Sequence, residues 1–285
     1  MNTLKLAIQK SGRLSESSLK LIKECGITFP TRMARLKAQA FNFPVEFLYL
    51  RDDDIPGYVE DRVVDVGIVG ENVLLEKAGN LEIVKRLGFS KCRLSIAVPK
   101  DFDYQGSDSL NGLNIATSYP RILATFLSDK GIEADIHQIS GSVEIAPGIG
   151  LSEAICDIVS TGSTLVSNGL KEVEVIQHSE AVLVARPDLA GKQREILDQL
   201  LFRINSVMTA NSNKYILLNA PNEAIEQITS LLPGMRSPTI VPLAQEGWSS
   251  LHSVVKEDDF WQVIENLREA GAEGILVIPI EKMIL

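Results

Sequence analysis

A short apolar run, a turn of small residues and a helix-forming stretch recur through the first two thirds of the chain. In the first repeat, residues 4–8 form the apolar run, Ser11 and Gly12 supply the turn, and a helical pattern ends at Gly26. The same pattern predicts further strands at residues 63–69, 94–98, 113–117, 135–139, 155–159 and 173–176. Strands that alternate with helices predict an α/β fold with a largely parallel sheet, and such sheets bind ligands beyond the carboxyl ends of their strands.

The last quarter of the chain follows a different order. Strands are predicted at residues 215–218, 239–242, 249–255 and 274–280, with helices at 221–232 and 257–270. Strand, helix, two strands, helix, strand over roughly 70 residues is the order of a ferredoxin-like βαββαβ domain. The polar residues 210–213 mark the expected boundary before this domain.

Composition and charge restrict the class of protein. The 285 residues are 45% hydrophobic and 23% charged, which is ordinary for a soluble globular chain. The net charge of −9 argues against nucleic-acid binding, although residues 1–40 hold eight Lys or Arg and two acids. Such a basic segment fits a localised site for an anionic small molecule, and it fits a solvated helix face equally well.

The sequence also restricts the cellular location. The chain start lacks a signal-peptide core and no apolar run is long enough to span a bilayer, so we expect a cytoplasmic protein that does not bind membranes. Cys25, Cys92 and Cys156 fit neither a disulfide framework nor a zinc spacing, and we interpret them as buried or idle thiols in a reducing compartment.

The strongest local signal for a binding site follows the predicted strand at 155–159. Small and mostly hydroxylated residues stand there in the order Ser160, Thr161, Gly162, Ser163 and Thr164. Small side chains let backbone N–H groups approach a phosphate, and a helix that begins near Thr164 adds positive potential. The lysine and the spacing of a P-loop are absent. A Ser/Thr-rich turn with a helix cap explains the same pattern equally well.

Two acids are expected beside this segment. Asp157 lies in the strand that precedes it, and Glu144 lies in a turn at residues 141–148. Carboxylates at these places suit the hydroxyls of a ribose, while helix capping or a salt bridge are the ordinary alternatives. Since no third acid or histidine is near in sequence, the pair is a poor fit for a protein-held metal cage.

Cations gather near the first predicted strand-to-helix turn. Lys10, Gly12 and Arg13 form this turn, and Arg35 and Arg51 lie on segments that enter the same lobe. Cations that converge on a helix N-terminus favour a polyphosphate ligand, although any single arginine among them is more simply a solvated surface residue.

Several separate segments, in order along essentially the whole chain, resemble motifs of the long-form ATP phosphoribosyltransferase family. They are QKSGRL at 9–14, RDDDIP at 51–56, DVGIVGEN at 65–72, GSVE at 141–144, DIVSTGSTL at 157–165, SPT at 237–239 and PIEKM at 279–283. The resemblance implies a two-lobed catalytic part like type II periplasmic binding proteins, with residues 1–92 and 182–210 in lobe I and 93–181 in lobe II. It implies an ACT-like regulatory domain at 212–285.

The resemblance also implies an activity, the joining of ATP to phosphoribosyl pyrophosphate (PRPP), with Mg²⁺ carried mainly by the substrate polyphosphates. Its implied PRPP-binding residues are Asp157, Ser160, Thr161, Gly162, Ser163 and Thr164, with Asp157 and Glu144 as catalytic residues. Its implied ATP-binding residues are Lys10, Gly12, Arg13, Arg35, Arg51, Glu71 and Asn72. Asn72 departs from the family pattern, because many members carry aspartate there, and a neutral amide changes the contact with the nucleotide.

For the tail, the resemblance implies feedback inhibition by histidine, with Asn219 and Thr239 in the inhibitor pocket. It implies assembly of identical chains from dimers to a hexamer. Two other functions fit the residues: a non-catalytic solute-binding protein of the same two-lobed architecture, and a phosphoribosyltransferase that acts on another base.

Overall fold

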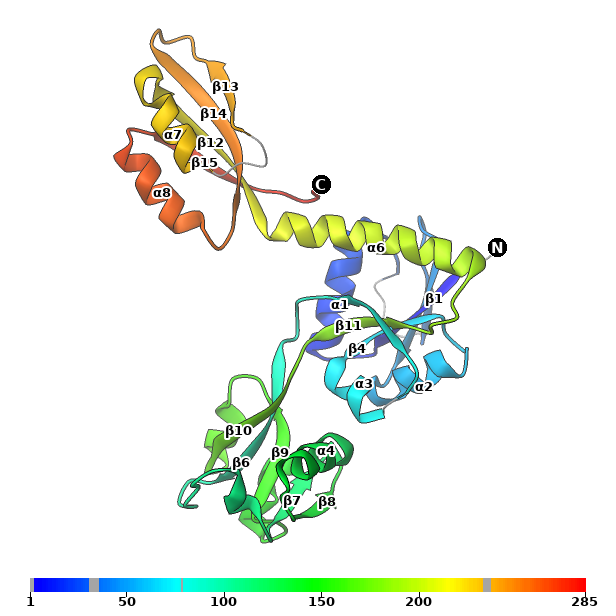
Figure 1. The fold of residues 1–285 in the computed structure, drawn as a ribbon. Coiled ribbons are helices and arrows are strands. Elements are labelled where there is room, and N and C mark those ends of the chain that lie inside the picture. Colours follow the sequence, from blue (N-terminus) through cyan, green and yellow to red (C-terminus); the bar gives the residue numbers. More distant parts are fainter. Residues whose placement is uncertain (1–2, 31–35, 78, 233–236) are drawn as a thin grey trace. The chain divides into compact units, whose positions relative to one another are not determined.

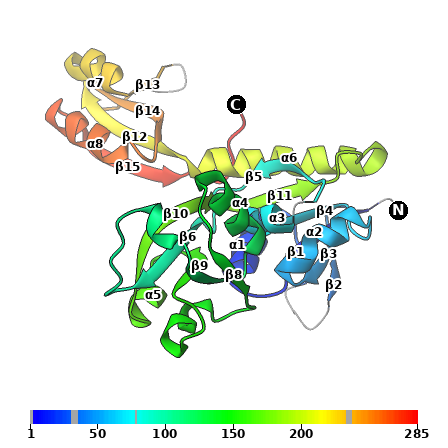
Figure 2. The ribbon, with the colours of Figure 1, turned by 60° about the horizontal axis from the view of Figure 1, so that its bottom comes forward.

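Lobe I is built on a mixed sheet of six strands in the order β2-β3-β1-β4-β11-β5. In that order the strands are Lys37–Gln39, Val45–Leu50, Leu4–Gln9, Val66–Gly70, Ala181–Ala185 and Glu82–Arg86. The central strand β1 pairs in parallel with both β3 and β4, which lie beside it in Figure 2. The carboxyl ends of these three strands therefore share one edge of the sheet, which we call the lobe I edge. This computed structural model of the chain describes residues 3–30, 36–77, 79–232 and 237–285.

The helices of lobe I follow the strands that end at this edge. They are α1 (Arg13–Glu24) after β1, the short η1 (Asp52–Asp54) and α2 (Ile55–Glu60) after β3, and α3 (Glu71–Lys77) after β4. Gly67 on β4 allows α2 to pack closely, because a Cβ at this position would lie 2.5 Å from Cγ2 of Ile55. Apolar residues of α2 and β4 are buried together in the core of the lobe.

Lobe II is built on a sheet of five strands in the order β10-β6-β9-β7-β8. In that order the strands are Leu170–Ser179, Cys92–Pro99, Ala154–Val159, Asn114–Thr117 and Asp135–Gln138. Its helical segments are η2 (Ser107–Leu110), α4 (Pro120–Lys130), η3 (Val143–Ile145), η4 (Pro147–Ile149) and α5 (Ser163–Ser167). β7 pairs in parallel with β8 and β9, so their carboxyl ends share a second edge, the lobe II edge.

The prediction of largely parallel sheets is wrong, because both sheets are mixed. The chain enters lobe II along β6 and returns along β10, and strands that run out and back must be antiparallel. The returning chain continues as β11, which is antiparallel to both β4 and β5 in lobe I. The two lobes are thus joined by paired strands that the alternating sequence pattern does not reveal (Figure 1).

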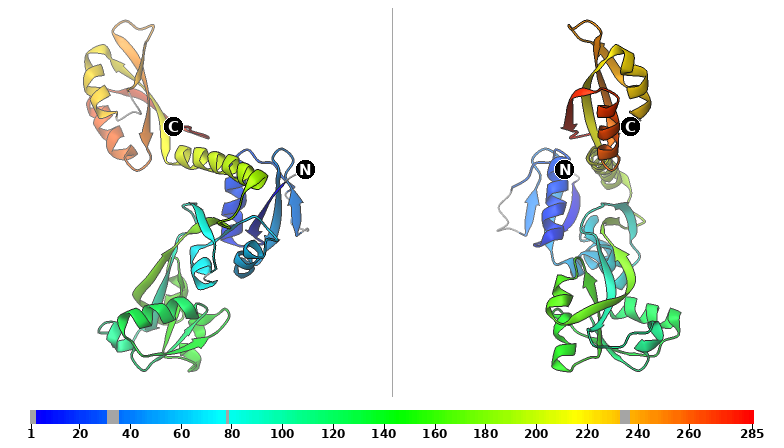
Figure 3. Two further views of the ribbon diagram at one scale, coloured as in Figure 1. Left: turned by 45° about the vertical axis from the view of Figure 1, so that its right-hand side comes forward. Right: turned by 90° about the vertical axis from the view of Figure 1, so that its left-hand side faces the viewer.

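The tail has the predicted ferredoxin-like topology. After the long helix α6 (Gly191–Asn211), the chain forms β12 (Asn213–Pro221), η5 (Asn222–Ala224), α7 (Ile225–Leu231), β13 (Thr239–Pro242), β14 (Trp248–Lys256), α8 (Phe260–Glu269) and β15 (Glu273–Pro279). The sheet order β13-β14-β12-β15 is fully antiparallel. Figures 1 and 3 show α7 and α8 on the same face of this sheet, where Ile228 and Leu267 are buried.

The fold prediction of a two-lobed α/β part and a βαββαβ tail is therefore confirmed. The polar segment at 210–213 is not an extended linker, since α6 runs to Asn211 and β12 begins at Asn213. The chain forms two compact units, one of residues 1–20 and 27–197 and the other of residues 21–26 and 198–285. Within the described part of the chain, every helix is too short or too polar to cross a membrane.

Candidate functional site

The lobe II edge brings together the turns that follow three neighbouring strands. Thr117 at the end of β7 is in register with Gln138 of β8 and Cys156 of β9. The polar residues that come next, Tyr119 after β7, Glu144 after β8 and residues 160–164 after β9, therefore belong to the same edge. This is the edge at which open α/β sheets bind ligands.

Residues 160–164, which we call the hydroxyl loop, form a tight turn into α5. Gly162 has φ of 81°, a left-handed conformation that glycine adopts without strain, and α5 begins at Ser163. The hydroxyls of Thr161 and Ser163 lie 3.0 Å apart and hydrogen bond to each other. Ser160, Thr161, Ser163 and Thr164 are all exposed, so their hydroxyls and the loop amides are accessible to a ligand.

The two predicted acids lie close enough to interact. The pKa of the half-buried Asp157 is raised to about 6: burial is the main cause, the negative charge of Glu144 adds to it, and a hydrogen bond from the Ile158 amide acts against both. That amide donates to Oδ1 of Asp157 over 2.8 Å. Raised carboxyl pKa values are typical of functional sites, and here the cause is partial burial beside a second acid.

Tyr119 is a site residue that the sequence analysis missed. Its hydroxyl accepts a hydrogen bond of 3.1 Å from Nδ2 of Asn72, which joins α3 of lobe I to the start of α4 in lobe II. Burial raises the pKa of Tyr119, and the negative charges of Asp157, Asp53 and Asp52 raise it further. The tyrosine therefore lies among acids from both lobes.

The lobe I edge holds most of the predicted cations. Gln9 of β1 is in register with Leu50 of β3, and the Lys10 amide donates to the Leu50 carbonyl over 2.8 Å. Lys10 and Arg51 thus leave neighbouring parallel strands side by side, and Gly12, with φ of 95°, turns the chain into α1 at Arg13. The side chains of Lys10, Arg13 and Arg51 are exposed. Arg35 lies outside the described residues.

Asp52 is a second residue that the sequence analysis did not single out as a ligand. The pKa of this carboxyl is raised to about 6: burial is the main cause, the neighbouring Asp53 adds to it, and a hydrogen bond from the Gly70 amide acts against both. Among the described residues, its Oδ1 is buried without a hydrogen-bond partner. A second acid with a raised pKa therefore lies at the lobe I edge.

Glu71 and Asn72, two predicted nucleotide contacts, are both engaged in contacts within the chain. The buried Glu71 accepts two hydrogen bonds from Arg86, of 2.5 and 2.6 Å. Oδ1 of Asn72 accepts from the Ser179 hydroxyl over 2.9 Å while its Nδ2 donates to Tyr119. A Cβ at Gly70 would lie 2.5 Å from Oδ1 of Asn72, so glycine there leaves room for this amide.

The two predicted inhibitor contacts share one face of the tail sheet. Asn219 of β12 pairs with Ser250 of β14, and Thr239 of β13 pairs with His252 two residues further along the same strand. Since residues two apart on a strand point to the same face, all four lie on one side. The hydroxyl of Tyr215 lies 2.8 Å from Nδ1 of His252, which orders this polar face.

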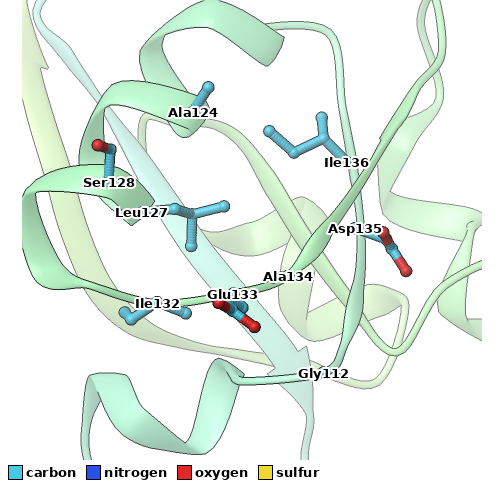
Figure 4. A pocket seen from close by; sticks show the side chains of 9 residues that line it. All are labelled: Gly112, Ala124, Leu127, Ser128, Ile132, Glu133, Ala134, Asp135 and Ile136. Carbon is cyan, nitrogen blue, oxygen red and sulfur yellow. The ribbon is translucent and has the colours of Figure 1, made fainter.

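Lobe II also contains a hollow of about 570 Å³, shown in Figure 4. None of the predicted site residues lines it. Its lining includes Gly112 and Glu133, which come before β7 and β8. It therefore lies at the amino ends of the parallel strands, opposite the edge that carries the hydroxyl loop. The size of this hollow does not make it the candidate site.

The acids at the two edges fit a metal ion that arrives with its ligand. No group of three or more His, Cys, Asp or Glu side chains is arranged to hold a metal within the described ranges. Mg²⁺ commonly takes one or two carboxylates and keeps phosphate oxygens and waters as its other ligands. Asp52, with a buried oxygen that has no described partner, and Asp157 are carboxylates suited to that role.

Comparison with known proteins assigns the family. Residues 51–206 match the family described as ATP phosphoribosyltransferase, and residues 210–282 match the family described as HisG, C-terminal domain. An ATP phosphoribosyltransferase of Cytophaga hutchinsonii is 63% identical over 99% of this chain and 98% of its own length. One of Bacteroides thetaiotaomicron is 56% identical over 99% of this chain and 100% of its own length.

A solved structure agrees with these sequence matches. A chain of the ATP phosphoribosyl transferase (HisG:HisZ) complex from Thermotoga maritima has a TM-score of 0.62 and 30% identity, and the match covers 71% of this chain and 97% of that chain. The first family match spans the hydroxyl loop and the acids Asp157 and Glu144, and the second spans most of the tail. The chain belongs to the ATP phosphoribosyltransferase family of histidine biosynthesis.

Proposed function

We propose that this chain joins ATP to PRPP to give N1-(5-phosphoribosyl)-ATP and pyrophosphate, the first step of histidine biosynthesis. Adenine N1 donates its lone pair to C1 of PRPP, the N1–C1 bond forms with inversion, and the C1–O bond breaks so that pyrophosphate leaves with that electron pair. The observation that carries the proposal is the meeting of the hydroxyl loop with Asp157 and Glu144 at one sheet edge.

The lobe II edge binds the sugar phosphate of PRPP. The loop amides and the hydroxyls of Ser160, Thr161, Ser163 and Thr164 donate to the 5-phosphate, with Gly162 allowing close approach. Asp157 and Glu144 accept hydrogen bonds from the ribose hydroxyls. Positive charge develops on the ribose ring as pyrophosphate departs, and fixed carboxylates close to it stabilise that charge.

The lobe I edge binds the polyphosphates. Lys10, Arg13 and Arg51 are exposed cations at the ends of neighbouring strands, and they neutralise the triphosphate of ATP and the leaving pyrophosphate. Mg²⁺, for which Asp52 and Asp157 offer suitable carboxylates, would add charge neutralisation to the polyphosphates when bound. Catalysis then depends on positioning and electrostatics, without a covalent intermediate on the enzyme.

Hydrogen bonds between α3 and α4 support closure of the lobes around the substrates. Oε1 and Oε2 of Glu76 accept from the amides of Arg121 and Ile122 over 2.9 and 3.0 Å, next to the bond between Asn72 and Tyr119. Closure excludes water that would hydrolyse PRPP.

One assay tests the activity against its two alternatives. Purified chain is mixed with ATP, PRPP and Mg²⁺, and phosphoribosyl-ATP and pyrophosphate are measured. A solute-binding protein gives neither product, and a phosphoribosyltransferase for another base releases pyrophosphate only when that base replaces ATP. Thr164→Trp should abolish turnover without unfolding the chain, whereas Thr125→Trp, an exposed threonine on α4, should leave turnover unchanged. Unchanged turnover in Thr164→Trp would remove the loop assignment.

For the tail, the proposal is inhibition by histidine at the face that carries Asn219 and Thr239. Thr239→Val and Asn219→Leu should weaken inhibition by histidine in the full chain while leaving the uninhibited rate unchanged. Removing residues 212–285 should abolish inhibition, and inhibition that persists would place the inhibitor elsewhere. Assembly of dimers into hexamers, measured by light scattering with and without histidine, accompanies this regulation in the proposal.

A further inference from the structure

Arg93 and Glu172 form an ion pair with two parallel hydrogen bonds beside the hydroxyl loop. Arg93 lies on β6 and Glu172 on β10, the two strands that join the lobes. Nε of Arg93 donates to Oε1 of Glu172 and Nη2 donates to Oε2, each over 2.5 Å. A guanidinium held at two points in this way has a fixed plane and orientation.

The third nitrogen of the same guanidinium reaches the loop itself. Nη1 of Arg93 donates to the carbonyl oxygen of Ser160 over 3.2 Å. The backbone places it there, because Arg93 is in register with Val159, the residue before Ser160. The Ser95 hydroxyl donates to Oε1 of Glu172 over 2.7 Å and so holds the carboxylate from the other side.

The pair is only partly exposed and keeps its charges. The side chains of Arg93 and Glu172 are 30% and 24% exposed. The hydrogen bonds from Arg93 lower the pKa of the Glu172 carboxyl more than its partial burial raises it, and Glu172 in turn raises the pKa of Arg93. Both groups therefore stay ionised at neutral pH.

A carbonyl at the start of a phosphate loop has two possible directions. Turned toward the ligand, its oxygen repels the phosphate, and turned away, it leaves the following N–H groups free to face the ligand. Here a cation holds the Ser160 carbonyl from the side of β6. We propose that Arg93 is a positioning residue that fixes the peptide at Ser160 so that the hydroxyl loop is preformed for the 5-phosphate of PRPP, and that Glu172 orients Arg93 for this task. This inference rests on the proposed function of the loop.

The next acid on the same strand provides a matched control. Glu174, also on β10, accepts hydrogen bonds from the hydroxyls of Tyr104 and Ser107 and pairs with Lys130 at 3.7 Å. Its side chain is 20% exposed, close to the value for Glu172. Its described partners lie outside the hydroxyl loop, so Glu174→Gln removes a comparable charge without touching the loop.

The experiment compares Glu172→Gln, Arg93→Gln and Glu174→Gln in the full chain, with steady-state kinetics for each substrate. Loss of a charge-assisted contact predicts that Glu172→Gln and Arg93→Gln raise KM for PRPP by about tenfold while KM for ATP stays within about twofold. Arg93→Lys should lie between wild type and Arg93→Gln, because an ammonium group holds only part of the three-bond arrangement. Glu174→Gln should leave both KM values unchanged.

Hydrogen exchange keeps the inference testable if a variant loses stability. Amides of residues 160–165 should exchange faster in Glu172→Gln than in Glu174→Gln at equal distance below the melting temperature of each variant. Equal exchange in the two variants, or an unchanged KM for PRPP in both Arg93 variants, would overturn the positioning role while leaving the proposed function intact. Absence of phosphoribosyl-ATP in the wild-type assay would instead overturn the proposed function, and loop exchange would still report on the Arg93 contact.

Discussion

The edges of the two lobes carry complementary chemistry, and they differ in how much of it is built before a ligand arrives. At the lobe II edge, the hydroxyls of Thr161 and Ser163 are bonded to each other, Asp157 is bonded to an amide, and the Ser160 carbonyl is held by Arg93. At the lobe I edge, the side chains of Lys10 and Arg51 are exposed and make no hydrogen bond or ion pair with a residue that the structure describes. In the proposed function, the half of the site that binds the sugar phosphate is therefore preformed, whereas the half that binds the polyphosphates consists of exposed cations.

This difference has a physical reason. The reacting carbon of PRPP requires fixed dipoles and charges, because groups that need no reorganisation stabilise developing charge most effectively. A triphosphate and its metal vary in conformation, and long flexible cations can follow them while remaining solvated. We therefore expect changes at the lobe II edge to lower kcat or raise KM for PRPP, and changes at the lobe I edge to raise KM for ATP in a salt-dependent way.

The largest effect is expected for Asp157→Asn. The amide keeps the size of the carboxylate but loses its negative charge, so it no longer stabilises the cationic ribose ring, and kcat should fall by about 10²–10³-fold. Because the half-buried carboxylate carries a raised pKa, replacing it by a neutral group should leave the melting temperature unchanged or raise it. Circular dichroism and product formation measure the two quantities on the same sample.

The matched variant for this test is Asp135→Asn, an exposed acid of the edge strand β8 in the same lobe. It should leave kcat unchanged. A kcat within twofold of wild type in Asp157→Asn would show that the lobe II edge is not where the ribose charge is stabilised.

A smaller effect is expected at the lobe I edge. Arg51→Gln and Lys10→Gln should each raise KM for ATP by about tenfold at low salt, because each removes a cation from a polyphosphate site. The increase should shrink as salt rises, since exposed charges are screened. Lys20→Gln, on the exposed part of α1 beyond Arg13, is the control and should leave KM for ATP unchanged. An increase that does not depend on salt would mean that these cations are fixed like the groups of lobe II.

Sequence patterns predicted features built from contiguous residues well and features built from distant segments poorly. The hydroxyl loop, Asp157 and the strand before them are contiguous, so local residue order is sufficient to find them. Strand β3 and helix α6 were not predicted, and the mixed sheets escaped because pairing between β6 and β10 joins segments far apart in sequence. Sequence order does not show which segments meet.

The site residues that the sequence analysis missed escaped for the same reason, because their partners lie far away in the sequence. Tyr119 and Asn72 are 47 positions apart, and Ser179 is 107 positions from Asn72. Arg93 and Glu172 are separated by 79 positions. Each residue alone resembles a surface or core residue, and its role follows from the partner that the fold brings to it. The one sequence signal near Tyr119 is its place directly before Pro120, which opens α4 at a strand end.

A third prediction uses pH to separate the two edges. In the proposed mechanism Asp157 stabilises the cationic ribose ring only when it is ionised. Its pKa is raised to about 6, so kcat/KM for PRPP should fall as the pH drops through about 6. Glu144→Gln removes a negative charge that raises this pKa, and the acid limb of the remaining activity should move to lower pH. A pH–rate profile of each variant measures the shift.

Asp52 is the control for that profile, because its pKa is also raised to about 6 but at the other edge. Asp52→Asn should leave the acid limb for PRPP in place. An acid limb that disappears in Asp52→Asn and is unmoved in Glu144→Gln would assign the ionisation to lobe I.

The smallest effect is expected between the two edges, for Asn72→Asp, which introduces the residue that the family resemblance leads us to expect at this position. Asn72 now donates to the Tyr119 hydroxyl and accepts from Ser179. An aspartate can accept from both hydroxyls, so the number of hydrogen bonds is kept if the Tyr119 proton turns toward position 72. The added negative charge lies close to a tyrosine already surrounded by acids, and kcat/KM should change by no more than about threefold.

In a Tyr119→Phe background the same substitution should lose its effect, since the hydroxyl whose hydrogen bond must reverse direction is gone. A tenfold or larger loss of kcat/KM in Asn72→Asp alone would mean that the amide contacts the nucleotide directly. The hydrogen bond between Asn72 and Tyr119, which links the two lobes, would then belong to the ATP-binding half of the site.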